Sequence, residues 1–203
     1  MKRKQLPSIL FLSLLLAGCY GCTNSETEVG SHFTGYYKIT SLVAEKALDL
    51  NNDGLTSFDL YHEISSPYHL EEGQEAIPFY DFDQISNYAE VRPTLVQSTS
   101  TPLIIFRIPR QEIAERTDFR EKPFLIMYTH DMTDFLYTFA SAEEVALERV
   151  NEETPHSIQS PRLKKDTDDQ FTLDFTGTFY DFKTDQWVET PTKAVYRKVD
   201  ILP

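Results

Sequence analysis

Apolar and polar side chains alternate over long stretches of this chain, and the alternation restricts its fold more than any other feature. Large apolar residues occupy every second position over 135–139 and again over 171–175. Side chains two residues apart share one face of a β-strand, whereas a helical face repeats every three or four residues. The alternation therefore predicts strands that bury one face and expose the other.

Other segments also have the composition of strands, and turn-forming residues separate them. We expect further strands over 37–43, 79–82, 88–96, 104–108, 124–128 and 187–201. Pro93 weakens the third of these, because proline cannot donate a ladder hydrogen bond. Gly177 lies within the strand expected over 171–179, and a glycine there often marks a bulge or a tight bend. Residues 130–134 are predicted to form a turn and 151–169 a charged loop.

The segment 141–144 allows two interpretations. Ser141 followed by Glu144 matches a capping box that opens a helix. The same residues fit a turn that leads into a strand over 145–150, where Val145, Leu147 and Val150 are apolar. We favour the strand because the neighbouring segments are strands.

Together these segments predict an all-β fold of about eight antiparallel strands, joined mostly in sequence order. Such a sheet either exposes its edges or closes on itself, and an up-and-down barrel removes the edges. A two-sheet sandwich is the alternative. We expect one short helix near 56–64, capped by Thr56 or Ser57 and packed through Phe58, Leu60 and Ile64.

The N-terminus has the features of a bacterial lipoprotein signal. Lys2, Arg3 and Lys4 precede a leucine-rich run over 6–17, which is far shorter than the roughly 20 residues of a membrane span. Leu16-Ala17-Gly18-Cys19 then matches a lipobox, in which the signal is cleaved and the new N-terminal cysteine is lipidated. We therefore expect residues 1–18 to be a signal peptide. Cys19 would anchor the protein in the cell envelope, by preference in the outer membrane of a Gram-negative bacterium.

The mature chain is acidic and has no disulfide framework. The sequence contains 32 Asp and Glu against 19 Lys and Arg, a net charge of −13. Nucleic-acid binding needs clustered cations, so this charge argues against a nucleic-acid partner. Cys22, the second of two cysteines, has no partner for a disulfide within the domain. Residues 19–32 are polar and fit a lipidated flexible tether, which leaves 33–203 as a single domain.

One loop has the pattern of a calcium-binding site. Asp49, Asn51 and Asp53 place oxygen atoms at positions 1, 3 and 5, and Gly54 follows at position 6, as in the first half of an EF-hand loop. The remaining candidate ligands are the backbone carbonyl of Leu55 and the side chains of Ser57 and Asp59.

The second half of this loop departs from the EF-hand pattern. Position 12, which requires a bidentate glutamate, is Leu60. Loss of that ligand would lower calcium affinity into the extracellular range of about 10⁻⁴–10⁻³ M. Asp, Asn and Gly also build turns by hydrogen bonding to their own backbone, so a purely structural turn is the alternative.

The opening of the domain resembles a known family. Gly35-Tyr36-Tyr37, followed by Asp49-Leu50-Asn51-Asn52-Asp53-Gly54, is similar to the Gly-x-Trp strand and Asp-Leu-Asn-x-Asp-Gly loop of Bacteroidetes lipocalin-like lipoproteins. Tyr37 stands where that family usually has tryptophan. The resemblance covers about thirty residues and implies a calycin-type barrel that holds a small apolar ligand.

Three functions fit these observations. The first is a non-enzymatic module that binds a small hydrophobic molecule or a glycan fragment, with Tyr37, Tyr128, Tyr137 and Trp187 as candidate lining residues. The second is an assembly lipoprotein that docks on another envelope protein. The third, an enzyme, ranks last, because the five histidines lack metal-binding spacing and no nucleophile elbow or phosphate loop occurs.

Overall fold

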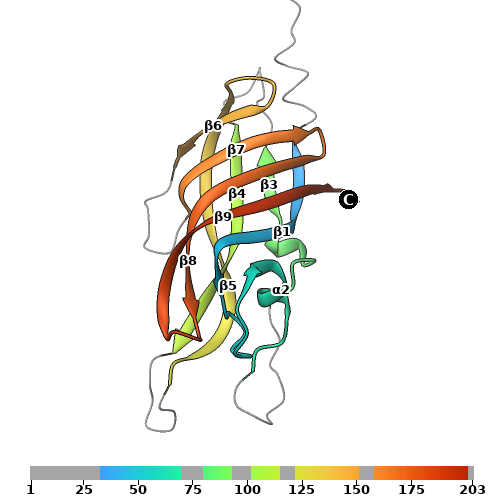
Figure 1. Ribbon diagram of the computed structural model, residues 1–203. Coiled ribbons are helices and arrows are strands. Elements are labelled where there is room, and N and C mark those ends of the chain that lie inside the picture. Colours follow the sequence, from blue (N-terminus) through green and yellow to red (C-terminus); the bar gives the residue numbers. More distant parts are fainter. Residues whose placement is uncertain (1–32, 70–79, 93–101, 115–121, 151–157, 201–203) are drawn as a thin grey trace, which may run out of the picture.

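The computed structural model describes residues 33–69, 80–92, 102–114, 122–150 and 158–200. These residues form one antiparallel sheet and very little helix (Figure 1). The strands are β1 (Gly35–Leu48), β2 (Ser57–Asp59), β3 (Ala89–Arg92), β4 (Leu103–Ala114), β5 (Phe124–Phe139), β6 (Glu144–Arg149), β7 (Gln159–Thr167), β8 (Gln170–Asp181) and β9 (Gln186–Val199). The helices are α2 (Leu60–Ser65) and the single 3₁₀ turn η1 (Ile85–Asn87). No helix in the described ranges is long and apolar enough to cross a membrane.

The sheet closes into an eight-stranded barrel with β2 as an additional strand. Strands β3 to β9 pair with their sequence neighbours, and β1 pairs with both β3 and β9 to complete the circle. The β1–β9 ladder, which closes the barrel, extends from Tyr36↔Val199 to Ala44↔Thr192. This arrangement confirms the predicted up-and-down barrel and shows that the two-sheet sandwich was wrong.

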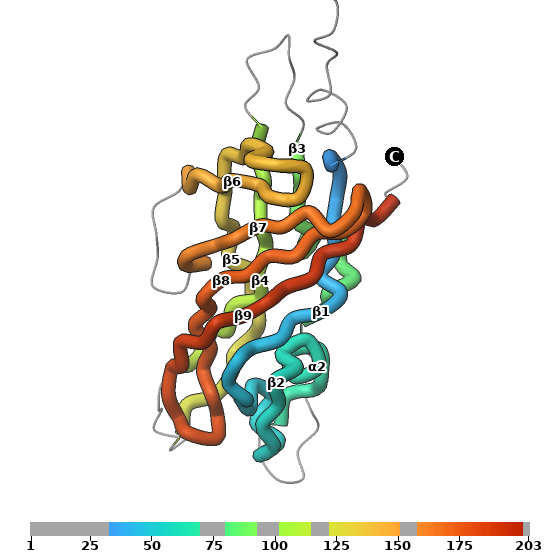
Figure 2. Tube along the Cα trace, turned by 45° about the horizontal axis from the view of Figure 1, so that its top comes forward, coloured from blue at the N-terminus to red at the C-terminus, as the bar shows by residue number. Residues whose placement is uncertain are grey.

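The short strand β3 leaves part of the barrel wall to other elements. It pairs with β1 only from Gly35 to Tyr37, so the lower part of β1 is free to pair with β2 and to contact α2 (Figure 2). The ring of Tyr61 in α2 stacks on Phe82, with centroids 4.3 Å apart. The amide of Tyr80 donates to the carbonyl of Ile64 over 3.2 Å. The helix and the segment 80–88 therefore pack together beside β1.

The predicted short helix is present, but it begins later than expected. Asp59, rather than Thr56 or Ser57, caps it by accepting a hydrogen bond from the amide of His62 over 3.1 Å. The expected cap was wrong because Ser57 and Asp59 pair with β1 as strand β2 and so hold the chain extended up to Leu60.

Three other local predictions were wrong. The turn expected at 130–134 lies inside the continuous strand β5, whose ladder with β4 includes Pro109↔His130 and Ile105↔Asp134. The loop expected over 151–169 contains β7 from Gln159 onward, held to β8 by pairs such as Leu163↔Leu173. The described part of the strand expected over 79–82 is a turn with buried aromatic rings. The strand favoured over 145–150 is confirmed as β6.

Candidate functional site

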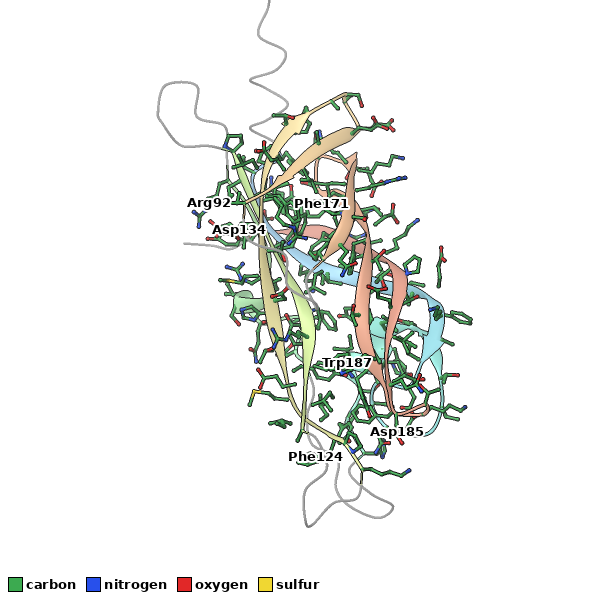
Figure 3. The ribbon with its side chains drawn as sticks, turned by 90° about the vertical axis from the view of Figure 1, so that its left-hand side faces the viewer. Arg92, Phe124, Asp134, Phe171, Asp185 and Trp187 are labelled. Atoms are coloured by element: carbon green, nitrogen blue, oxygen red, sulfur yellow. The ribbon has the colours of Figure 1, made fainter. Side chains whose placement is uncertain are left out.

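The upper interior of the barrel is filled with aromatic side chains. Phe171 lies at the centre of this cluster (Figure 3), with its ring stacked on Tyr196 at 4.7 Å between centroids. Phe106 packs edge-on against Phe171 at 6.1 Å and contacts Tyr196 at 5.8 Å. Further rings complete the cluster: Phe33, Tyr37, Phe135, Tyr137 and Phe139. These side chains occupy the space in which a calycin barrel would hold a ligand.

The lower interior is crossed by a side chain that joins opposite walls. The side-chain amide of Gln111 in β4 donates through Nε2 to the backbone carbonyl of Tyr180 over 3.0 Å. Its Oε1 accepts from the backbone amide of Tyr180 over 2.8 Å. Strands β4 and β8 are not neighbours in the sheet, so these bonds run across the barrel. A second apolar cluster packs around them: Tyr68, Leu125, Tyr180 and Phe182.

A very small cavity lies beside Gly177 of β8. A cavity of about 10 Å³ is lined by Ile108, Ile158, Phe175, Gly177 and Phe179, among other residues. That volume is about what one water molecule requires. This cavity therefore cannot hold an organic ligand.

The four candidate lining residues lie in three different environments. Tyr37 and Tyr137 are core residues whose hydroxyls donate to the carbonyls of Phe33 and Arg92, both over 2.9 Å. Burial raises the pKa of Tyr37, so its hydroxyl remains a neutral donor. Trp187 is 42% exposed at the lower end of β9 and lines neither cavity (Figure 3).

Tyr128 is the one candidate that faces a sizeable cleft. The cleft opens on the outside of the barrel and has a volume of about 510 Å³. The segment 80–87 forms one wall through Tyr80, Asp81, Gln84, Ser86 and Asn87, and β5 forms the other through Tyr128, Thr129 and His130. Ligand pockets for small molecules usually measure about 300–1,000 Å³, so this cleft is large enough for one.

Local hydrogen bonds fix the shape of the first wall. Asp81 accepts from the amide of Asp83 over 2.9 Å, and its carbonyl accepts from the side chain of Asn87 over 2.8 Å. Gln84 opens the turn η1 and is exposed together with Ser86. The side chains of Gln84 and Ser86 can therefore donate and accept hydrogen bonds at the cleft surface.

The second wall contributes a phenol ring and an imidazole. Tyr128 donates its hydroxyl to the carbonyl of Leu50 over 3.1 Å, which fixes the ring against Tyr80 at a centroid distance of 6.4 Å. Partial burial lowers the pKa of His130, and the nearby Arg107 lowers it further, whereas Asp131 opposes the shift. His130 is therefore a neutral imidazole at neutral pH, able to donate and accept one hydrogen bond each.

The loop predicted to bind calcium is closed by hydrogen bonds between its own residues. The side chain of Asp49 accepts from the backbone amide of Gly54 over 2.9 Å. The side chain of Asn51 accepts from the backbone amide of Asp53 over 3.1 Å, and the side chain of Asp53 accepts from that of Leu55 over 2.8 Å. Each of these side chains, at positions 1, 3 and 5 of the loop, therefore accepts from a backbone amide that follows it in the same loop. Ser57 and Asp59 instead lie in β2, where Ser57 accepts from the amide of Asp59 over 3.0 Å.

Two further points complete the site description. Among the described residues, no three His, Cys, Asp or Glu side chains form a group that could hold a metal ion. Cys19, the predicted lipidation site, lies outside the described residues.

No protein-family model, curated protein or solved structure matches this chain.

Proposed function

We propose that the protein is a non-enzymatic, lipid-anchored module of the cell envelope that binds a glycan fragment in its outer cleft. The observation that supports this proposal most is the contrast between the two spaces. The outer cleft measures about 510 Å³, whereas the enclosed cavity measures about 10 Å³. A ligand of several heavy atoms fits only the first of these.

The side chains of the cleft favour a polar ligand over a hydrophobic one. Tyr80 is only 5% exposed and Tyr128 is half-buried, so these two residues form a small apolar floor of the cleft, and Gln84, Ser86 and His130 offer hydrogen-bonding groups around it. Sugars combine small apolar C–H faces with many hydroxyl groups, so they match a small apolar floor surrounded by polar side chains. The alternative ligand class, a small hydrophobic molecule, would need the barrel interior that the aromatic cluster occupies.

The cellular location in this proposal rests on the N-terminal sequence. The lipobox ending at Cys19 places the domain on a lipid anchor, and the polar segment 19–32 would act as its tether. The closed barrel and the Asp49–Gly54 loop fit a place among the lipocalin-like lipoproteins of Bacteroidetes. A tethered domain on the outer membrane would sample glycans close to the cell surface.

A glycan array probed with the full-length protein in mild detergent tests the proposal. Ser86 is exposed and lines the cleft, so Ser86→Trp would fill the cleft without disturbing the core. Ser86→Ala is the matched control. We expect the wild type and Ser86→Ala to bind a common set of glycans that Ser86→Trp loses. Absence of glycan binding, or equal binding by Ser86→Trp, would refute the assignment.

Docking on another envelope protein is a second candidate, supported by exposed apolar side chains near β2. Leu55 is 69% exposed and Phe58 57% exposed, and Val43 is exposed on the adjoining part of β1. Apolar groups gathered on a surface often mark an interaction site. Cross-linking in cells would distinguish the candidates, because a docking role predicts that Phe58→Ser reduces a specific cross-linked species while Ser86→Trp leaves it unchanged.

A further inference from the structure

We propose that the loop Asp49–Leu55 binds one calcium ion through Asp49, Asn51, Asp53 and the backbone carbonyl of Leu55. This site adjoins the glycan cleft through Tyr128, which donates to the carbonyl of Leu50, but it does not depend on the function proposed for the cleft. The inference rests on the geometry of the loop and on a buried carboxylate oxygen that has no partner.

The loop is already folded around its candidate ligands. Asn52 at φ +60° and Gly54 at φ +84° are both left-handed, which produces the sharp reversal of the chain. The side chain of Asn52 donates to the carbonyl of His69 over 2.6 Å, and the amide of His69 donates to the carbonyl of Asn51 over 2.8 Å. These two hydrogen bonds tie the loop to His69 without using the side chains of the candidate ligands.

Asp49 provides the observation that points to a cation. The residue is only 1% exposed, and one carboxylate oxygen, Oδ2, accepts from the amide of Gly54. The other oxygen, Oδ1, is buried and has no hydrogen-bond partner among the described residues. A buried, unpaired carboxylate oxygen is costly unless a proton or a metal ion satisfies it. The carboxylate as a whole lies against the loop, because Oδ2 accepts from the amide of Gly54 and the backbone of Asn52 and the side chain of Asp53 are its other close neighbours.

Two more carboxylates surround the base of the loop. Glu63 and Asp181 are each 4% exposed, and they accept from the amides of Leu50 over 3.0 Å and Asp49 over 2.9 Å. Asp49, Glu63 and Asp181 take part in none of the ion pairs between the described residues. Three buried carboxylates therefore give the start of the loop a negative charge that is poorly solvated, and a divalent cation would neutralise part of it.

The proposed ligands are mixed oxygen donors, so the site contains fewer than three acidic ligand side chains. Only two carboxylates, Asp49 and Asp53, are proposed as ligands, and the other two are the amide oxygen of Asn51 and the carbonyl of Leu55. Calcium accepts such mixed oxygen ligands and completes its shell with water, whereas magnesium requires a stricter octahedron. Glu63 and Asp181 are positioning residues, because they hold the backbone at the start of the loop.

Thermal unfolding of the chelator-treated, full-length protein in detergent tests this site with calcium alone as the probe. We expect a saturable rise in Tm of about 3–8 °C, with half-saturation at about 10⁻⁴–10⁻³ M. Asp49→Asn should abolish the shift. Asp53 is exposed, and Asp53→Asn should keep the local turn. This variant should raise the calcium concentration at half-saturation by at least about tenfold, and it tests the site even if Asp49→Asn does not fold.

Asp59→Asn is the matched control. It removes one acidic charge four residues beyond Leu55, and asparagine still caps α2, so this variant should retain the full calcium shift. Magnesium at the same concentration controls for screening of the acidic surface and should produce less than about a third of the shift. Terbium provides a second readout, because Tyr128, bonded to the Leu50 carbonyl, lies close enough to the loop to sensitise its luminescence.

Each outcome decides the question. A calcium shift that is lost in Asp49→Asn or weakened in Asp53→Asn, and kept in Asp59→Asn, supports the site. No shift in the wild type overturns it and leaves a structural turn. Equal shifts in all four proteins, or an equal shift with magnesium, also overturn it, because they indicate diffuse binding to the acidic surface. None of these measurements includes a glycan, so failure here is distinct from failure of the cleft.

Discussion

The ring of Phe179 occupies the space into which a side chain at Gly177 would project. A Cβ atom built on Gly177 would lie 2.7 Å from Cε2 of Phe179 and 3.1 Å from Cε2 of Phe175. All three residues belong to β8, and the pair Gly177↔Thr190 keeps the strand in register. The glycine is therefore required for the close approach of two rings, and the continuous register between β8 and β9 shows no bulge at this position.

The substitution Gly177→Ala should destabilise the barrel. The new methyl group would meet two aromatic rings in a closely packed interior, and overpacking of this kind costs about 1–3 kcal/mol. Urea unfolding would measure the loss. Phe179→Leu in the same chain should recover part of it, because the smaller side chain yields space. Strictly additive losses in the double variant would contradict this explanation.

Gln111 makes two bonds that no apolar side chain can replace. Gln111→Leu would leave the buried amide and carbonyl of Tyr180 without these partners, which should cost about 2–4 kcal/mol. Gln186→Leu, at an exposed position of β9, is the matched control and should change stability by less than about 0.5 kcal/mol. If the two variants unfold at the same urea concentration, the bridge between β4 and β8 contributes nothing.

The stability of the protein should depend on pH through His130. Burial and Arg107 hold its pKa below the usual value of about 6.5, so the unfolded chain takes up the proton first as the pH falls. The contribution of neutral His130 to the free energy of unfolding is therefore fully present above pH about 6.5. It is lost as the pH decreases toward the lower pKa of His130 in the folded state. His130→Asn should flatten the decline in Tm over this interval. Parallel curves for the two proteins would show that the imidazole has no such effect.

The anchoring of the protein should depend on Cys19 alone. Cys19→Ser removes the thiol that the lipobox presents for lipidation, so the protein should leave the membrane fraction on cell lysis. Cys22→Ser, three residues further, is the control and should remain with the membranes. Membrane retention of Cys19→Ser would contradict the lipobox interpretation.

The barrel could be predicted from the sequence because its strongest strands alternate clearly. The apolar residues of 171–175 face inward in β8 as expected, and Phe135 and Tyr137 do so in β5. The predictions failed where polar residues occupy strand positions. Between His130 and Asp134 only Thr133 is buried, yet the ladder with β4 keeps the whole segment extended.

The outer cleft could not be predicted, because its two walls are about forty residues apart in the sequence and meet only through the fold. Tyr128 was a candidate on account of its amphipathic ring, but nothing near Gln84 or Ser86 indicates a site. The proposed calcium loop carries a local signal, since the spacing of Asp49, Asn51 and Asp53 places three oxygen-bearing side chains in one short loop. The burial of Asp49 and the neighbouring Glu63 depends on the packing of α2, which only the structure reveals.

Aromatic side chains fill the upper interior of the barrel, and we therefore expect a ligand to bind outside it. Titration with N-phenyl-1-naphthylamine, an apolar dye that fluoresces inside hydrophobic cavities, tests this claim most directly. Phe58→Ser is included to remove the exposed apolar surface near β2. We predict no saturable rise in fluorescence with the folded Phe58→Ser protein. A saturable rise with one dye per chain, displaced by a fatty acid, would show that the interior opens to ligands and would contradict the account.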